Sequence, residues 1–157
     1  MLKSLSLILV ACWLGAAIFF SAVVAPAAFS VLRSFQISNA SEIAGGIVNR
    51  SLSIINVSGF LIGVLSLLIV LAVRSRWMIL EAIALAVLSV MTAVGQWVIA
   101  ARIHAIRAAL SVPIDQLPLN DPQRVAFASL HRYSVIALSI AIIAALIASL
   151  LIARHQQ

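Results

Sequence analysis

Residues 134–153 read SVIALSIAIIAALIASLLIA. This stretch has no charged residue and has the length of about 20 residues that an α-helix needs to cross a bilayer. Three further apolar stretches of similar length lie at residues 5–29, 52–73 and 79–101. None shows the alternating segments of about ten residues that a membrane β-barrel requires. The sequence therefore predicts an all-α membrane protein, with four transmembrane helices in an antiparallel bundle.

The composition of the whole chain favours the same class. Hydrophobic residues make up 64% of the 157 residues and charged residues 9%, against about 45–50% and about 25% in soluble domains. A water-soluble domain of this size could not bury so much apolar surface, so lipid must solvate much of it. We expect one domain over residues 1–157 and a multi-pass location, which in a prokaryote is the inner membrane.

The charged residues indicate membrane lipids as partners. The formal net charge of +6 favours contact with anionic headgroups. The ten Lys and Arg residues lie singly near helix ends and form no basic face, which argues against nucleic-acid binding. The positive-inside rule leaves the orientation open, because six of them fall on one side and four, including Lys3, on the other.

The first apolar stretch has competing interpretations. Residues 9–12 (LVAC) after Lys3 are similar to a lipoprotein cleavage box, and the alanines near Ala27 could follow a signal peptide. The apolar run continues well past Cys12, whereas the apolar region of a signal peptide is short. We therefore expect a retained first helix. As the single cysteine, Cys12 excludes an intrachain disulfide.

The three connections are predicted to differ. Residues 74–76 (RSR) indicate a tight turn. In the first connection, Ser38 or Ser41 is expected to cap a helix that continues into the second span, with Glu42 in its first turn. In the third, residues 120–122 (NDP) indicate a cap followed by proline at the first helical position. Helices two, three and four should thus project about two to three turns beyond the bilayer on one side.

Small residues at four-residue spacing predict close helix packing. They occur at Gly59 and Gly63 of the second span, where such spacing lets backbones approach in lipid. The first span repeats the pattern at Ala17, Ser21 and Ala25, and the fourth at Ala137, Ala141, Ala145, Ser149 and Ala153. Packing within the bundle is the expected use, and a homo-oligomer through these faces is the alternative.

Polar residues gather toward the end with the projecting helices. Helical periodicity aligns in-membrane amides with cations beyond the bilayer, and buried polar groups need partners. The predicted ligand-binding cluster consists of Arg50, Asn56, Gln96, Arg107, Arg124 and His131. It could receive an anion, a lipid headgroup or an acidic cofactor edge. The alternative is a hydrogen-bonded cap whose arginines snorkel to lipid phosphates.

No other constellation carries chemistry. Glu81, near Arg74 and Arg76, is expected to form an interfacial ion pair rather than a proton relay. His104 and His131 fall on one side of the membrane, so bis-histidine haem ligation is topologically allowed. We find no Ser/His/Asp pattern, carboxylate pair or phosphate-binding glycine loop, and expect no catalytic residues, no metal and no cofactor.

Several short motifs resemble the transmembrane-protein-205-like family, a membrane domain of unknown function. They are residues 13–15 (WLG), 19–20 (FF), 24–29 (VAPAAF), 44–50 (AGGIVNR) and 127–134 (FASLHRYS). The family's proline before the arginine that follows helix three is absent at Ala101-Arg102. The resemblance implies a four-helix membrane protein without catalytic residues, whose eukaryotic members are linked to drug resistance. It also places Arg50 and His131 in family motifs.

The sequence thus predicts a small non-enzymatic membrane protein, transporter-like or an accessory subunit, with a cationic polar site at one end. One alternative is a haem-binding or electron-transfer subunit that uses His131. Another is a purely structural partner in a larger membrane complex.

Overall fold

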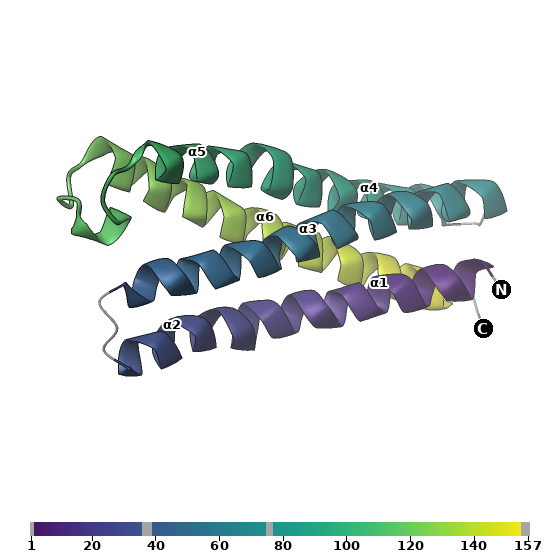
Figure 1. Cartoon of the computed structure of the whole chain (residues 1–157). Helices are drawn as coiled ribbons and strands as arrows, with labels where there is room; N and C mark the ends of the chain where they lie inside the picture. The colour runs from purple at the N-terminus through teal and green to yellow at the C-terminus, as the bar shows by residue number, and fades with distance from the viewer. Residues whose placement is uncertain (1, 36–38, 75–76, 155–157) are drawn as a thin grey trace.

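The computed structural model describes residues 2–35, 39–74 and 77–154. Within these ranges the chain forms no strand, and four helical segments are long and apolar enough to cross a membrane. They run Leu2–Ser34, Ala40–Val73, Met78–Ala109 and Pro122–Arg154. Successive segments are antiparallel (Figure 1). The predicted all-α, four-helix architecture is confirmed, and the protein is a multi-pass integral membrane protein.

Two of the four segments contain a π-helical stretch. The first comprises α1 (Leu2–Phe19), η1 (Phe20–Val24) and α2 (Ala25–Ser34). The third comprises α4 (Met78–Ala93), η2 (Val94–Ala100) and α5 (Ala101–Ala109). The others are α3 (Ala40–Val73) and α6 (Pro122–Arg154), with a 3₁₀ turn, η3 (Ile114–Gln116), before α6. Pro26 explains η1, because its ring would collide with the carbonyl of Ala22 in a regular α-helix.

The segments pack as a ring of neighbours. α3 lies against α4 and α4 against α6, while α1 lies against both α3 and α6. α2 packs on α3 and has no buried residue. In Figure 1, the α2–α3 pair and the α5–α6 pair spread apart toward the end that holds α2 and the α5–α6 loop. The helices are therefore farther apart at that end than at the end that holds the chain termini.

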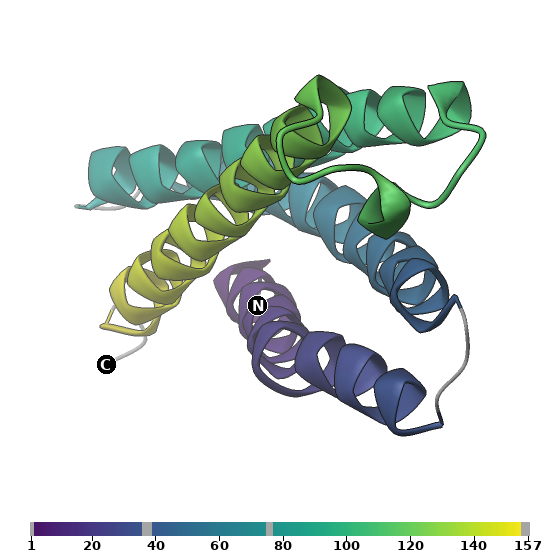
Figure 2. The same cartoon turned by 90° about the vertical axis from the view of Figure 1, so that its left-hand side faces the viewer.

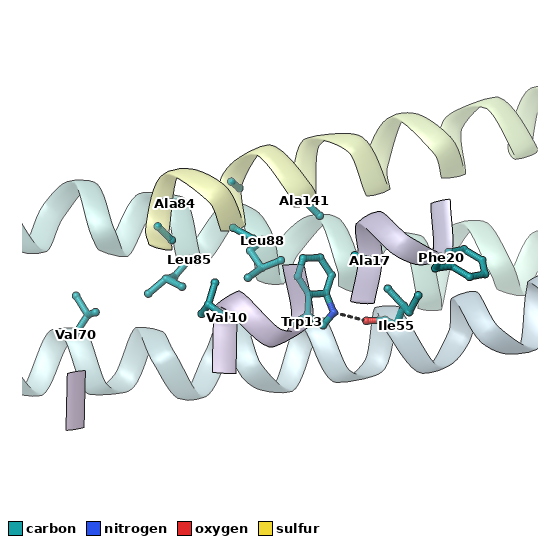
Figure 3. Packing of buried hydrophobic residues seen from close by; sticks show 13 residues of the cluster. Val10, Trp13, Ala17, Phe20, Ile55, Val70, Ala84, Leu85, Leu88 and Ala141 are labelled. Atoms are coloured by element: carbon teal, nitrogen blue, oxygen red, sulfur yellow. Dashed lines mark hydrogen bonds between the residues drawn. The ribbon is translucent and has the colours of Figure 1, made fainter. Parts of the chain in front are cut away.

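Small residues form much of the bundle interior. Ala141, Ala145 and Ala148 of α6 are fully buried. Gly59 of α3 allows the indole of Trp13 to lie against the backbone, and the Trp13 Nε1–H donates to the Ile55 carbonyl at 2.9 Å (Figure 3). The predicted packing role of Gly59, Ala141 and Ala145 is confirmed, and Ala148, outside the predicted spacing, is buried with them. Ser21 is exposed, and a homo-oligomer through small-residue faces stays a prediction.

The helix ends follow the predicted caps in part. Asp121 caps α6, because its Oδ1 accepts the N–H of Gln123 at 2.8 Å and Pro122 opens the helix. α3 begins at Ala40 after Asn39, so the prediction of Ser41 as the cap is wrong: Ser41 already lies within the helix. Ser38 lies outside the described residues.

The predicted projection of the helices is confirmed. α3 starts before the second apolar stretch, α5 extends past the third, and α6 starts before the fourth, each by about two to three turns. The first segment also continues to Ser34, about one turn further than expected, because no helix breaker follows Pro26. Arg74 ends α3 with a left-handed φ of 46°; Ser75 and Arg76 lie outside the described residues.

An ion pair joins two segments at the end opposite the projecting helices. Lys3 Nζ of α1 lies 3.7 Å from Glu81 Oε2 of α4, and the Glu81 side chain is fully buried. The expected ion pair at Glu81 is confirmed, with Lys3 as a partner. Arg76 lies outside the described residues. The starts of α1 and α4 lie at the same end of the bundle, the end that holds the chain termini (Figure 1).

Candidate functional site

A cavity of about 500 Å³ lies inside the projecting end of the bundle. Its lining comes from α2, α3, α5, α6 and the loop that connects α5 to α6. Hydrophobic side chains form much of the wall: Phe29, Val48, Leu52, Ile103, Leu110, Val112, Pro113, Ile114 and Phe127. Its size and largely apolar lining fall within the range of small-molecule sites in proteins.

The loop between α5 and α6 is held over the cavity by an arginine. Figure 2 shows this loop and η3 reaching from the α5–α6 pair toward α3. Arg124 Nη1 donates to the carbonyls of Leu117 and, at 3.3 Å, of Asp115. Because one guanidinium satisfies two loop carbonyls, the loop position is fixed from the first turns of α6. Arg124 itself does not line the cavity.

Arg107 is the cation of the cavity wall. Its guanidinium carbon lies 5.4 Å from the centroid of the Phe127 ring, a cation–π distance. A Cβ added at Gly45 would come within 2.5 Å of Arg107 Nη2. The glycine thus lets the guanidinium lie directly against α3. Among the described residues, Arg107 has no ion-pair or hydrogen-bond partner.

Other polar side chains surround the same cavity. Asn49 of α3, His131 and Ser134 of α6, and the carboxylates of Glu42 and Asp115 all line it. The lining therefore contains groups of both charge signs. None of these charged groups forms an ion pair with another in the described part of the chain.

The six predicted site residues fall in different places. Arg107 and His131 line the cavity, and Arg124 holds the loop. Asn56 is 3% exposed and packs against Gly95, where an added Cβ would lie 3.0 Å from Asn56 Nδ2.

The two remaining predicted residues also lie away from the cavity. Gln96, in η2, has a buried Oε1 without a hydrogen-bond partner among the described residues. Arg50 is exposed on α3. The structure therefore brings together two of the six residues in the cavity, Arg107 and His131, and distributes the rest over the bundle.

The sequence analysis did not assign the two carboxylates of the cavity, Glu42 and Asp115. A signal for Glu42 was available, because Glu42, Gly45, Asn49 and Leu52 recur at helical spacing on one face of α3. Residues 103 and 107 of α5, with residue 110 directly after the helix, repeat that spacing, as do residues 127, 131 and 134 of α6. Asp115 belongs to the loop between α5 and α6, and in a loop the sequence periodicity does not indicate which way a side chain points.

His104 and His131 have separate surroundings. His104 Nε2 lies 2.9 Å from Asn49 Nδ2 and does not line the cavity, whereas His131 does. Within the described residues, no three His, Cys, Asp or Glu side chains gather as a metal site. Haem ligation by His131 stays a prediction.

Comparison with known proteins places the chain in a family. No curated protein and no solved structure matches it. Residues 8–111, more than half of the chain, match the profile described as Domain of unknown function (DUF4149). The match runs from α1 through α5 and includes Glu42, Gly45 and Arg107 of the cavity. The chain therefore belongs to the DUF4149 family of membrane domains.

Proposed function

We propose that this protein is a non-enzymatic membrane protein that binds an amphiphilic ligand in the end cavity, with Arg107 holding the ligand's anionic group. The observation that carries the proposal is a half-buried guanidinium in the wall of a 500 Å³ cavity, without an ionic partner among the described residues. A cation withdrawn from water is stabilised by a charged acceptor, and the planar guanidinium suits carboxylates and phosphates.

The position of the cavity relative to the membrane supports an amphiphilic ligand. Leu52 and Ser134, which begin the second and fourth apolar stretches, both line the cavity, as does Ile103 just after the third. The cavity thus lies at the boundary between hydrocarbon and headgroups. Apolar walls would receive an acyl or other apolar group, while Arg107 receives the polar end.

The proposal is tested with an anionic lipid as the probe. Purified protein is titrated with phosphatidylglycerol, and binding is measured by native mass spectrometry for wild type, Arg107→Ala and Arg102→Ala. Arg102 is the matched control, because it lies on the same helix but is exposed and outside the cavity. A charge-assisted hydrogen bond contributes about 1.5–3 kcal/mol, so Arg107→Ala should weaken binding about 10- to 100-fold.

The control variant should bind the lipid like wild type. Equal binding by Arg107→Ala and Arg102→Ala would overturn the proposal. It would mean that the lipid is attracted to the surface charge in general and not to Arg107 in the cavity. His131→Ala should weaken binding less than Arg107→Ala, since a neutral imidazole donates a weaker hydrogen bond than a guanidinium.

The role that follows binding is also part of the proposal. The resemblance to the transmembrane-protein-205-like family favours a transporter-like role over that of an accessory subunit. Movement of labelled ligand across liposomes that contain only this protein would support transport. Ligand binding without such movement, together with a stable partner in native membranes, would support the accessory role. A visible absorption spectrum of the purified protein tests the haem alternative directly.

A further inference from the structure

We infer that the ligand of the end cavity is a zwitterion, with its anionic group at Arg107 and an amine received by Glu42 and Asp115. This inference rests on the proposed function and specifies the ligand's chemistry. It starts from the two carboxylates that line the same cavity as the guanidinium.

The charges of the cavity wall do not neutralise one another. The ion pair of the described residues joins Lys3 to Glu81 at the far end of the bundle, and Arg107 is paired with neither Glu42 nor Asp115. The wall therefore contributes one positive and two negative charges. A ligand with only negative charge would be attracted by Arg107 and repelled by both carboxylates. A ligand that also carries an amine would be attracted by the carboxylates as well.

The two carboxylates come from different elements around Arg107. Glu42 lies in the first turn of α3, one turn before Gly45, and Gly45 is the residue against which the Arg107 guanidinium lies. On a helix, residues three apart are surface neighbours about 5–6 Å from each other. Asp115 lies in η3, within the loop that Arg124 holds. Both carboxylates and the Arg107 guanidinium thus line one cavity.

The chemistry of the acceptors favours a primary amine. Carboxylates accept hydrogen bonds, and a primary ammonium donates three, whereas a quaternary ammonium donates none. Because the cavity lies at the boundary between hydrocarbon and headgroups, we expect the ligand to carry an apolar group as well. An aminoethyl phosphate supplies both charged groups, and the phospholipid that carries this headgroup also supplies the apolar group.

The experiment compares headgroups on identical acyl chains. Full-length protein is titrated with phosphatidylethanolamine, phosphatidylglycerol and phosphatidylcholine, and with soluble glycerophosphoethanolamine, and dissociation constants are measured by native mass spectrometry. Wild type should prefer the ethanolamine lipid to the other two by about tenfold, the scale of one charge-assisted contact. Soluble glycerophosphoethanolamine should displace the ethanolamine lipid only weakly, because it lacks the apolar group. Displacement at concentrations equal to those of the lipid would overturn the inference of a lipid ligand and identify a free zwitterion instead.

Charge-removing variants test the assignment of the amine. Glu42→Gln and Asp115→Asn should each reduce the preference for ethanolamine over glycerol, while binding of the glycerol lipid is kept or improved. Asp121→Asn is the matched control: it removes a carboxylate at the same end but outside the cavity, and asparagine is an equally good cap. The ratio between two lipids on one variant is independent of that variant's stability.

The possible outcomes separate the two proposals. Equal binding of ethanolamine and glycerol lipids, with both weakened by Arg107→Ala, would overturn the zwitterion inference and leave the proposed function intact. An ethanolamine preference that Glu42→Gln and Asp115→Asn leave unchanged would also overturn the inference. Binding that is insensitive to Arg107→Ala for every lipid would overturn the proposed function as well.

Discussion

The contact between α1, α3 and α4 at Gly59 allows a sharp test of the packing. A Cβ at Gly59 would lie 2.7 Å from Trp13 Cε2 and Nε1 and 2.8 Å from Thr92 Cγ2, so it would meet two helices at once. A Cβ at Gly15 would meet nothing within 4 Å. The same substitution, Gly→Ala, therefore meets neighbouring side chains at Gly59 and open space at Gly15.

The magnitude follows from the difference between the two alanine variants. Gly→Ala raises helix propensity by about 1 kcal/mol at either position, so this gain cancels in the comparison. Overpacking a tight core costs about 1–3 kcal/mol. Gly59→Ala should therefore be less stable than Gly15→Ala by about 1–3 kcal/mol, with Gly15→Ala as stable as wild type or more so.

Reversible unfolding in mixed detergent, followed by circular dichroism, measures this difference. A double-mutant cycle with Trp13→Leu adds a second test, because the cost of Gly59→Ala should shrink when the indole is absent. Equal stability of Gly59→Ala and Gly15→Ala would refute the close approach of the three helices. So would a cost at Gly59 that stays the same without the indole and in a Thr92→Ser background.

Two further substitutions test local contacts. Gly45→Ala should displace the guanidinium of Arg107, because the new Cβ would lie 2.5 Å from Nη2. Native mass spectrometry should then show severalfold weaker binding of anionic lipid. Gly46→Ala is the control and should leave binding unchanged, because its new Cβ would have no neighbour within 4 Å. Equal binding by both would contradict the placement of Arg107. Lys3→Met should lower the free energy of unfolding in detergent by about 1–3 kcal/mol, because the buried Glu81 carboxylate loses a charged partner. The Lys3→Met/Glu81→Met double variant should recover most of this loss, and a double variant no more stable than the single variant would contradict this.

Much of the fold could be predicted from the sequence because lipid imposes simple length and composition rules. The four apolar stretches and the Asp121–Pro122 cap determine where helices cross and where α6 begins. The start of α3 could not be predicted to the residue, since Asn39 lies between the two predicted caps, Ser38 and Ser41, and is an equally good capping residue. Local propensity does not decide between neighbouring candidates of equal quality.

The candidate site could be predicted only in part. Periodicity aligned Arg107 and His131 with the projecting ends of their helices, and both line the cavity. It could not give the rotation of one helix against another, which depends on close contacts such as that of Asn56 with Gly95. The role of Arg124 depends on carbonyl positions in an irregular loop.

The most direct test of the central claim is an experimental structure of the protein in nanodiscs that contain phosphatidylethanolamine and phosphatidylglycerol. We predict a lipid phosphate or equivalent anionic group at hydrogen-bonding distance, about 2.7–3.2 Å, from the Arg107 guanidinium. Its apolar part should lie along Leu52 and Ile103 in the end cavity. A water-filled cavity with Arg107 turned to bulk solvent, and ordered lipids only on the outer surface of the bundle, would contradict the account.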